Sequence, residues 1–436
     1  MPKTPSKTAP LRLGIAGLGT VGVGVIKIIQ RKANLLAQRT GRPIVVTAVC
    51  ARSRDKDRGI DMSHYAWEDD PVALALRDDV DVFVELMGGS DGPAKAATEA
   101  ALAAGKDVVT ANKAMLALHG QDLALRAEAK GAVLRYEAAV AGGIPVIKAL
   151  TEGLAGNRIE RIVGVMNGTC NYILTRMENE GLSYDEVFAA AKALGYLEAD
   201  PTLDVGGIDA GHKLALLASI GFGTQVDFEN MVLEGIERIT IEDIHHAADM
   251  GFRIKLLGVA QMTGRGLEQR MTPCLVPATS PLGQLENATN MVVLEGDEVG
   301  QIVLRGAGAG MGPTASAVMS DVIDIARGVR IPTFGVPADV LEKSTPAVAA
   351  TPAPYYLRMS LLDKPGALAK IAAALGDAGV SIDRMRQYGQ EANPEVAPVL
   401  IVTDATSRKS LDVALEGMSQ TGVLASEPVA IRIETV

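Results

Sequence analysis

The segment from Gly195 to Lys213, GYLEADPTLDVGGIDAGHK, concentrates residue types that can do chemistry. Pro201 and the paired glycines at 206–207 predict a loop in its first half, and the apolar run from Ile208 predicts a helix. Asp209 and Lys213 are four residues apart, so they share one face of that helix. A loop carboxylate such as Glu198, a helix carboxylate and a lysine can therefore converge on a small zwitterionic ligand.

The pairing of Asp209 with Lys213 has a simpler interpretation that must be weighed first. An acid and a base at this spacing on a helix most often form a solvated salt bridge, worth about 0.3–0.5 kcal/mol. Two features favour a functional site instead. The helix is otherwise apolar, and the residues upstream predict a dinucleotide-binding fold.

Composition limits the classes of protein to consider. The chain has 436 residues, 48% hydrophobic and 22% charged, which is typical of a globular protein with two or three domains. Its net charge of −10 disfavours partners such as nucleic acid or an anionic membrane. No apolar run is long enough for a membrane span, and the N-terminus lacks the apolar core of a signal peptide. Three separated cysteines without a CxxC pair predict reduced thiols and a cytoplasmic location.

The first positioning element is a glycine-rich turn between a strand and a helix. Residues 11–16, LRLGIA, predict a short apolar strand, and a long helical pattern runs to about Gln38. Between them stands G-x-G-x-x-G in the required context, and it indicates a pyrophosphate at the helix N-terminus. The alternative is a tight turn without a cofactor. The residues expected to contact the cofactor here are Gly17, Leu18, Gly19, Thr20, Val21 and Gly22.

The end of the second predicted strand, residues 44–50, bears on which coenzyme is bound. An NAD-specific site usually has an acidic residue there to hold the ribose 2′-hydroxyl. Here the sequence reads Ala51-Arg52-Ser53-Arg54. Arginines suit a 2′-phosphate, so we expect NADP, with Arg52 at the phosphate and NAD as the alternative. An ordinary basic surface turn would look the same.

Three more strands are predicted at residues 80–86, 106–110 and 132–137, separated by helical runs at 93–104 and 119–130. Alternating strands and helices with short loops predict a parallel, doubly wound sheet. Ligands of such sheets lie beyond the carboxyl ends of the strands, where Lys113 is found.

A second motif suggests a different chemistry: Gly88-Gly89-Ser90-Asp91-Gly92 matches the G-x-S-x-G of a hydrolase nucleophile elbow. A glycine-rich turn beside the cofactor explains it better, because the first strand already carries a phosphate loop.

The regular alternation of strands and helices ends near residue 158. Strands are predicted at 159–165, 254–262, 271–276, 290–295 and 299–304, with helices opening near Asn167, at 184–194 and at 314–327. These elements predict an open α+β domain. Proline-rich residues 331–354 have the composition of a linker. The order of elements from residue 355 is βαββαβ, which is a ferredoxin-like unit.

Together these motifs resemble the homoserine dehydrogenase family, in its monofunctional form with a C-terminal ACT domain. The resemblance covers almost the whole chain, and the 195–213 segment is its most specific part. Support comes from TANK at 110–113, NGTCNY at 167–172, PTAS at 313–316 and DKPGAL at 363–368. It implies a Rossmann domain at 1–150, a substrate-binding and dimerisation domain at 151–330, a linker at 331–354 and an ACT domain at 355–436. Residues 314–330 are expected to pack back on the Rossmann unit.

The resemblance implies reversible interconversion of L-homoserine and L-aspartate 4-semialdehyde, on the route to threonine, methionine and isoleucine. Lys213 is then the proton donor and acceptor, because a partly desolvated lysine near a second cation can have a lowered pKa. Lys113 is that second cation. Glu198 and Asp209 would bind the substrate ammonium group, and Thr169 and Tyr172 would line the substrate side. The remaining residues expected at the cofactor are Gly195, Gly308 and Gly310.

Two further expectations rest on the resemblance. Residues 137–145 look like a monovalent-cation loop, which would hold a structural sodium ion through Glu137 and the carbonyls of Val140, Gly142 and Ile144. From the residues alone, a tight strand-to-helix loop is the better interpretation.

The ACT-like unit implies an amino-acid effector, expected to be threonine, near a helix start such as Gly366. The alternative is a unit that only dimerises, and we expect a homodimer or homotetramer.

Two other functions are compatible with the same motifs. A dinucleotide-sensing regulator would read amino acids through its ACT domain without catalysis, and Glu198 and Lys213 would then be dispensable. A related amino-acid dehydrogenase acting on another aldehyde or ketone would keep the cofactor loop but differ in the 195–213 segment. Turnover of L-homoserine separates both from the enzyme that the resemblance implies.

Overall fold

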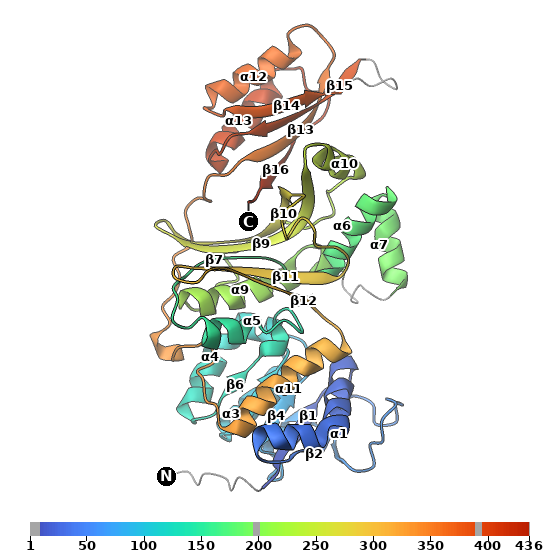
Figure 1. Cartoon of the computed structure of the whole chain (residues 1–436), viewed down its shortest axis with the longest axis vertical. Coiled ribbons are helices and arrows are strands. Elements are labelled where there is room, and N and C mark those ends of the chain that lie inside the picture. The colour runs from blue at the N-terminus through green and yellow to red at the C-terminus, as the bar shows by residue number, and fades with distance from the viewer. Residues whose placement is uncertain (1–8, 195–200, 389–394, 436) are drawn as a thin grey trace.

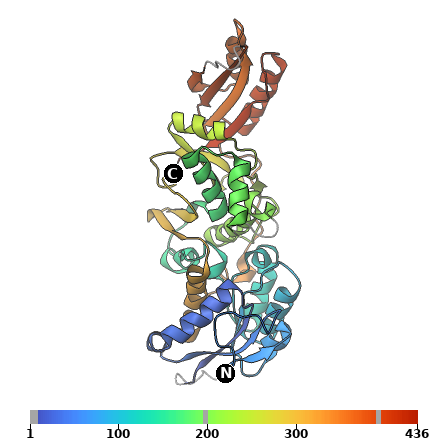
Figure 2. The ribbon, with the colours of Figure 1, turned by 90° about the vertical axis from the view of Figure 1, so that its right-hand side faces the viewer.

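The computed structural model describes residues 9–194, 201–388 and 395–435. Figures 1 and 2 show three parts in a row along the long axis, with the N-terminal unit at one end and the C-terminal unit at the other. In the described part of the chain, no helix is long and apolar enough to cross a membrane.

The N-terminal unit is a six-stranded parallel sheet in the order β3-β2-β1-β4-β5-β6. This order reverses direction beside β1, which is the point where such sheets bind ligands. The central strands are buried apart from Arg12 of β1, because helices cover both faces, as their apolar sequences predict. The strands are β1 (Leu11–Ala16), β2 (Ile44–Cys50), β3 (Ala66–Glu68), β4 (Val82–Glu85), β5 (Asp107–Thr110) and β6 (Leu134–Arg135).

Helices connect these strands, and polar caps set where two of them begin. Asp70 accepts hydrogen bonds from the amides of Val72 and Ala73, and Asn112 accepts one from Met115. The second cap starts a helix at Lys113, six residues earlier than the sequence predicts, so Lys113 lies in the first turn of that helix. The helices are α1 (Thr20–Thr40), α2 (Pro71–Leu76), α3 (Pro93–Ala103) and α4 (Lys113–Ala129).

The loop after β6 replaces the end of the predicted fifth strand. A short 3₁₀ turn, η1 (Glu137–Ala139), follows β6, and then come α5 (Val146–Lys148) and a π-helical turn, η2 (Ala149–Gly153). Ala141 has a φ of 52° and Gly142 a φ of 53°, so the chain turns through left-handed backbone here. The predicted strand is therefore only two residues long.

The middle unit is a mixed α+β layer. Its strands run antiparallel in the order β12-β11-β7-β9-β10, and β8 pairs with β10. They are β7 (Ile159–Val165), β8 (Val232–Leu233), β9 (Phe252–Thr263), β10 (Gly266–Pro277), β11 (Thr289–Gly296) and β12 (Gly300–Ala307). Its helices are α6 (Gly168–Glu180), α7 (Tyr184–Ala193), α8 (Thr202–Val205), α9 (Ile208–Phe222) and α10 (Ile241–Asp249).

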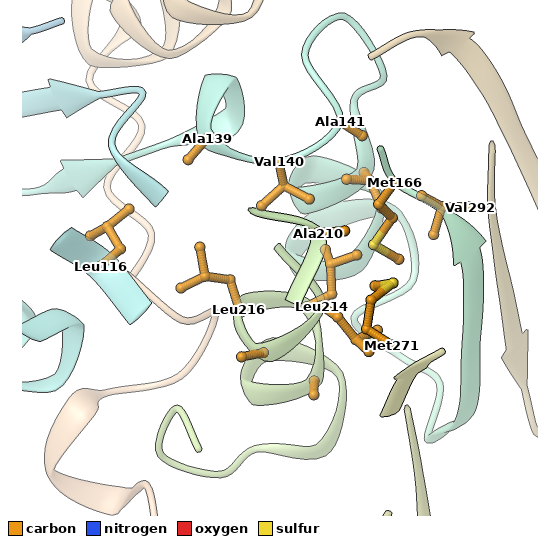
Figure 3. Close-up of a cluster of buried hydrophobic side chains, with 14 of the residues drawn as sticks. Leu116, Ala139, Val140, Ala141, Met166, Ala210, Leu214, Leu216, Met271 and Val292 are labelled. Atoms are coloured by element: carbon orange, nitrogen blue, oxygen red, sulfur yellow. The ribbon is translucent and has the colours of Figure 1, made fainter. Parts of the chain in front are cut away.

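One large core joins the middle unit to the N-terminal unit. Val140, Met166 and Leu214 belong to the same buried cluster, from the turn after η1, the end of β7 and α9 (Figure 3). Helix α11 (Met311–Arg327) crosses back and packs on α1, where Val318 and Val322 share a second buried cluster with Val25. These contacts hold the glycine-rich turn at a defined place relative to α9.

Residues 331–354 contain little regular structure beyond η3 (Ala338–Val340), but they lie against the body of the protein. Phe334 is 1% exposed and meets Tyr136 edge-on, with ring centroids 6.0 Å apart. An isolated bridge also joins Leu267 to Pro346. A proline-rich composition predicts missing secondary structure well, but it does not report whether the segment is packed.

The C-terminal unit has the predicted βαββαβ order of an ACT domain. Its elements are β13 (Tyr355–Leu362), α12 (Ala367–Asp377), β14 (Ile382–Gln387), β15 (Val396–Thr403), α13 (Arg408–Gln420) and β16 (Val429–Ile433). Strand β16 pairs in parallel with β10, so this sheet continues into the sheet of the middle unit. The carboxylate of Glu434 reinforces the junction because Arg161, Arg270 and Arg432 all contact it.

Candidate active site

The glycine-rich turn between β1 and α1 has the shape that a dinucleotide diphosphate requires. A Cβ atom at Gly17 would lie 2.3 Å from the carbonyl oxygen of Leu86, and one at Gly22 would lie 2.0 Å from that of Gly17. A Cβ at Gly19 would meet nothing within 4 Å. The turn is therefore closed on the protein side and open where a ligand approaches the N-terminus of α1. Leu18 is buried beneath it and Thr20 is exposed.

The loop after β2 carries the arginines expected at the coenzyme. Arg52 and Arg54 are exposed, and the loop that carries them is held by Arg58. The guanidinium of Arg58 donates to the carbonyl oxygens of Leu18, Ser53, Arg54 and Lys56, and it lies 5.7 Å from the ring centroid of Trp67. Arg58 has no distinguishing signal in the sequence, because it is one more arginine in a charged turn.

A cavity of about 560 Å³ lies between the N-terminal and middle units. Its walls bring together both lysines proposed for catalysis and several of the residues proposed for substrate, cofactor and sodium. Elements far apart in the sequence supply them: α1, α4, α6, α9 and the turn before α11. The predicted residues in the wall are Val21, Lys113, Gly142, Thr169, Asp209, Lys213, Gly308 and Gly310.

Asp209 joins the two lysines of this cavity. Its Oδ1 lies 2.8 Å from Nζ of Lys113, and its Oδ2 lies 2.6 Å from Nζ of Lys213. Burial alone would raise the pKa of Asp209, but the ammonium groups of Lys213 and Lys113 outweigh burial and hold that pKa well below its ordinary range. Asp209 is therefore ionised and fixes the positions of both cations.

Lys213 is directed by a second contact as well. Its Nζ donates to the carbonyl oxygen of Met166, at 2.9 Å, where β7 ends. Two of its three N–H groups are thus used within the described residues, and the third is available to a ligand. The side chain is 12% exposed, so it is partly desolvated yet reaches the cavity. This arrangement suits a group that exchanges a proton with a bound oxygen.

Not every predicted residue reaches the cavity. Tyr172 lies on α6 beside Arg176, whose Nη1 donates to its hydroxyl at 3.2 Å, and it is not among the described residues of the cavity wall. Gly195 and Glu198 lie outside the described residues, so their roles stay predictions. The hydrolase alternative gains no support from the geometry, because the Ser90 hydroxyl donates to Asp91 rather than to a histidine.

The loop proposed for sodium combines one buried carboxylate with a tight turn. Oε1 of Glu137 accepts the amide of Ile147 at 3.0 Å, and Oε2 accepts that of Lys148 at 2.9 Å. Burial, and then the charge of Asp321, raise the pKa of Glu137 to about 7. The carbonyl of Ile144 already accepts the amide of Val146. Each of these oxygens has a second lone pair for a cation, so the donor set is compatible with sodium.

The cavity also contains residues to which the sequence analysis gave no role. Asp204, on the short helix α8 where a loop was predicted, is 6% exposed and accepts a hydrogen bond from Nδ2 of Asn167 at 3.2 Å. The sequence did point toward Asp204, because this residue belongs to the acidic 195–213 segment. Asn290 on β11 gave no signal, because a single amide in an apolar strand is unremarkable in a sequence.

A glycine-rich βα turn that opens toward a cavity with two paired lysines defines a dinucleotide-dependent oxidoreductase. Family models agree with this class and make it specific. Residues 17–137 match the model described as homoserine dehydrogenase, NAD-binding domain, residues 145–323 match homoserine dehydrogenase, and residues 355–416 match the ACT domain.

Individual relatives give the same result over the full length. A homoserine dehydrogenase from Neisseria gonorrhoeae is 42% identical, covering 98% of this chain and 99% of that protein. A solved homoserine dehydrogenase from Thiobacillus denitrificans has a TM-score of 0.92 at 39% identity, covering 98% and 99% of the two chains. A mutant hyperthermophilic archaeal homoserine dehydrogenase, solved in complex with NADPH, has a TM-score of 0.62 at 28% identity, covering 72% and 97%. The chain belongs to the homoserine dehydrogenase family.

Proposed function

We propose that the protein interconverts L-homoserine and L-aspartate 4-semialdehyde with NADP as the preferred coenzyme, on the route to threonine, methionine and isoleucine. The observation that carries the proposal is the bridge from Lys113 through Asp209 to Lys213, in a cavity whose wall also includes Val21 of the dinucleotide turn. A cation pair held by one carboxylate next to a coenzyme site suits an amino-acid substrate with an oxygen at C4.

Each described residue then has a defined part in the reaction. When bound, the nicotinamide ring accepts or supplies the hydride at substrate C4. In oxidation, the neutral amine of Lys213 takes the proton from the substrate hydroxyl, and in reduction its ammonium gives that proton back. Asp209 orients Lys213 and Lys113, and with Glu198 it offers negative charge to the substrate ammonium group. Thr169 completes the substrate side, and Gly308 and Gly310 the coenzyme side.

The reducing direction tests the substrate. Incubation with L-aspartate 4-semialdehyde and NADPH is expected to yield L-homoserine, identified by chromatography against a standard. A protein that reduces other small aldehydes equally well but not this one would instead be a related dehydrogenase. A glycine-rich turn and a lysine alone do not exclude that alternative, so product identity is the required readout.

The coenzyme preference rests on the loop after β2. Arg58 bonds this loop to the dinucleotide turn through Leu18, which keeps Arg52 near the site expected for the adenosine ribose. A relative that is 28% identical was solved with NADPH. The exposed guanidinium of Arg52 suits a 2′-phosphate, which takes bidentate hydrogen bonds well.

Replacing Arg52 with alanine is therefore expected to raise KM for NADP about tenfold, the loss of one charge-assisted contact, while KM for NAD stays unchanged. Steady-state kinetics with both coenzymes measures this difference. The control is Arg31→Ala, which replaces an exposed arginine on α1 and should change neither KM value. An equal change in KM for NADP and for NAD in Arg52→Ala would show that Arg52 does not bind the 2′-phosphate.

We also propose a structural sodium ion held by Glu137 and the carbonyls of Val140, Gly142 and Ile144. The loop lies next to the cavity, because Gly142 is part of the wall and a Cβ there would be 2.3 Å from the carbonyl oxygen of Gly308. A cation would offset the buried charge of Glu137 and stiffen this wall. In this role it contributes no Lewis-acid step, because Lys213 handles the proton.

Regulation by threonine is the proposed role of the ACT domain, with Gly366 at the start of α12 as the expected binding region. A described route connects this domain to the cavity. Arg358 of β13 pairs with Asp243 of α10, and the Tyr388 hydroxyl donates to Asp249 at 2.9 Å. Helix α10 packs on α6, whose first residues line the cavity. An effector that moves β13 or Tyr388 therefore acts on α10 first.

Removing one contact of this route should uncouple regulation from catalysis. Tyr388→Phe deletes the bond to Asp249 and is expected to raise the threonine concentration for half-inhibition about threefold, with uninhibited kcat unchanged. Inhibition curves with wild-type enzyme, Tyr388→Phe and the control Tyr65→Phe test this; Tyr65 is half-buried in the N-terminal unit, where its hydroxyl accepts a hydrogen bond from Gln30. Identical curves for wild type and Tyr388→Phe would exclude this contact from the route, and no inhibition of wild type by threonine would exclude the effector.

The proposed division of the chain keeps a coenzyme domain at 1–150, a substrate and dimerisation domain at 151–330, a connecting segment at 331–354 and a regulatory domain from 355.

We propose that the protein forms a homodimer or homotetramer. Strand β14 supports this, because it is an outer strand of the ten-stranded sheet with all six residues exposed, including Ile382 and Met385. An open edge strand is a surface for pairing with another strand.

A further inference from the structure

The side chain of Asn290 is a buried amide whose oxygen has no partner among the described residues. It stands on β11 and is 1% exposed. Its Oδ1 is buried and has no hydrogen-bond partner among the described residues, and its Nδ2 makes no hydrogen bond within that part of the chain either. Buried amides are nearly always hydrogen-bonded, because an unpaired polar group loses its water without compensation. An amide left unpaired in a cavity wall therefore points to a ligand.

Two glycines set the space that the amide of Asn290 occupies in the cavity wall. Gly308 lies against it so closely that a Cβ there would be 2.2 Å from its Cγ and Nδ2. Gly142 packs on the carbonyl of Gly308 in the same way. A side chain at Gly308 would displace the amide, and one at Gly142 would displace the Gly308 backbone that lies against the amide.

The chemistry of the amide distinguishes between the possible ligands. The amino-acid substrate presents a cation, an anion and one oxygen at C4, and Asp209, Lys113 and Lys213 supply the complementary charges in the same cavity. An asparagine amide is neutral and has both a donor and an acceptor. Its natural complement is a neutral carboxamide, which also has one of each. The nicotinamide ring carries such a group.

The position of Asn290 agrees with this match. The cavity wall extends from Val21, at the dinucleotide turn, to Lys213, and Asn290 belongs to the same wall. A nicotinamide ring that exchanges hydride with a substrate held at Lys213 must lie between these two. We propose that Asn290 binds the carboxamide of the coenzyme and so fixes which face of the ring meets the substrate. This inference rests on the proposed function, since it assigns a residue of that same site.

A coenzyme analogue tests the contact by binding alone. In the 3-acetylpyridine analogue of NADP, a methyl group replaces the carboxamide nitrogen, so the donor to Oδ1 is lost. Calorimetric titration of the wild-type protein is expected to give a Kd about tenfold weaker for the analogue than for NADP. In Asn290→Ala, NADP should bind about tenfold more weakly, and the preference over the analogue should fall to within about twofold.

Matched variants separate the contact from a packing effect. Thr98→Val removes a hydroxyl on α3 that is also buried and has no partner in the described part of the chain. Thr98 lies away from the cavity, so this variant should leave both Kd values unchanged. Asn290→Ser replaces Asn290→Ala if the alanine variant does not fold. Unchanged discrimination in the variant, or equal binding of NADP and the analogue by wild type, would overturn the role of Asn290. A wild type that binds neither would overturn the proposed coenzyme too, whereas normal binding without homoserine turnover would count only against the proposed reaction.

Discussion

Replacing Lys213 with alanine is expected to lower kcat for homoserine oxidation by about three orders of magnitude, in the range attributed to a positioned acid–base group. The physical reason is the loss of the only described ammonium group that is held both by Asp209 and by the carbonyl of Met166 at the end of β7. Lys113 keeps its own bond to Asp209, at 2.8 Å, so the site retains one cation. Substrate and coenzyme should still bind.

Stopped assays at saturating L-homoserine, with circular dichroism to verify folding, measure this effect. Lys192→Ala removes an exposed lysine on α7 and should have normal kcat. A folded Lys213→Ala variant that keeps more than about a tenth of wild-type kcat would contradict the acid–base role. Lys113 would then be the next residue to examine, because it lies on the other oxygen of the same carboxylate.

Asp209→Asn is expected to lower kcat/KM by about 100-fold, because an amide can no longer hold both ammonium groups in place. The pH profile gives a second readout. Asp209 is held ionised by the two lysines, so it contributes no limb of its own to the wild-type profile at neutral pH. As pH falls, wild-type kcat/KM should therefore show no loss that comes from protonation of Asp209 until the pH is well below neutral.

The measurement is log kcat/KM against pH for wild type, Asp209→Asn and Asp185→Asn, an exposed residue in the first turn of α7. The control should reproduce the wild-type curve. A limb near neutral pH that wild type shows and Asp209→Asn lacks would mean that Asp209 itself titrates there and is not held ionised by the lysines. An unchanged kcat/KM would remove Asp209 from the site altogether.

Local signals predicted the elements of this fold well. The strand at Ile159–Val165 has the boundaries expected from its apolar run, and the elements after residue 355 follow the expected βαββαβ order. What the sequence did not reveal is which strand each one pairs with. The pairing of β16 with β10 depends on Arg161 and Arg270 meeting Glu434 across more than a hundred residues. Periodicity along one strand carries no information about such a partner.

In the site, too, local spacing was predictable and long-range contacts were not. Helical spacing placed Asp209 and Lys213 on one face, and their contact at 2.6 Å follows from that spacing. Lys113 was a candidate because of its place after a strand, but its bond to Asp209 depends on how α4 packs against α9. Arg58 and Asn290 could not be found from the sequence. Arg58 acts by holding backbone carbonyls, and Asn290 stands out only because its oxygen has no partner within the described residues.

The most direct test of the central claim is absorbance at 340 nm with the purified protein and L-homoserine, with NADP and with NAD. The account predicts a rise with both, faster with NADP, and its near absence in Lys213→Ala. If a folded wild-type protein that binds NADP gave no change with either coenzyme, the claim would be wrong. A sensor of dinucleotide and amino acid, or a dehydrogenase for another substrate, would then be the better interpretation.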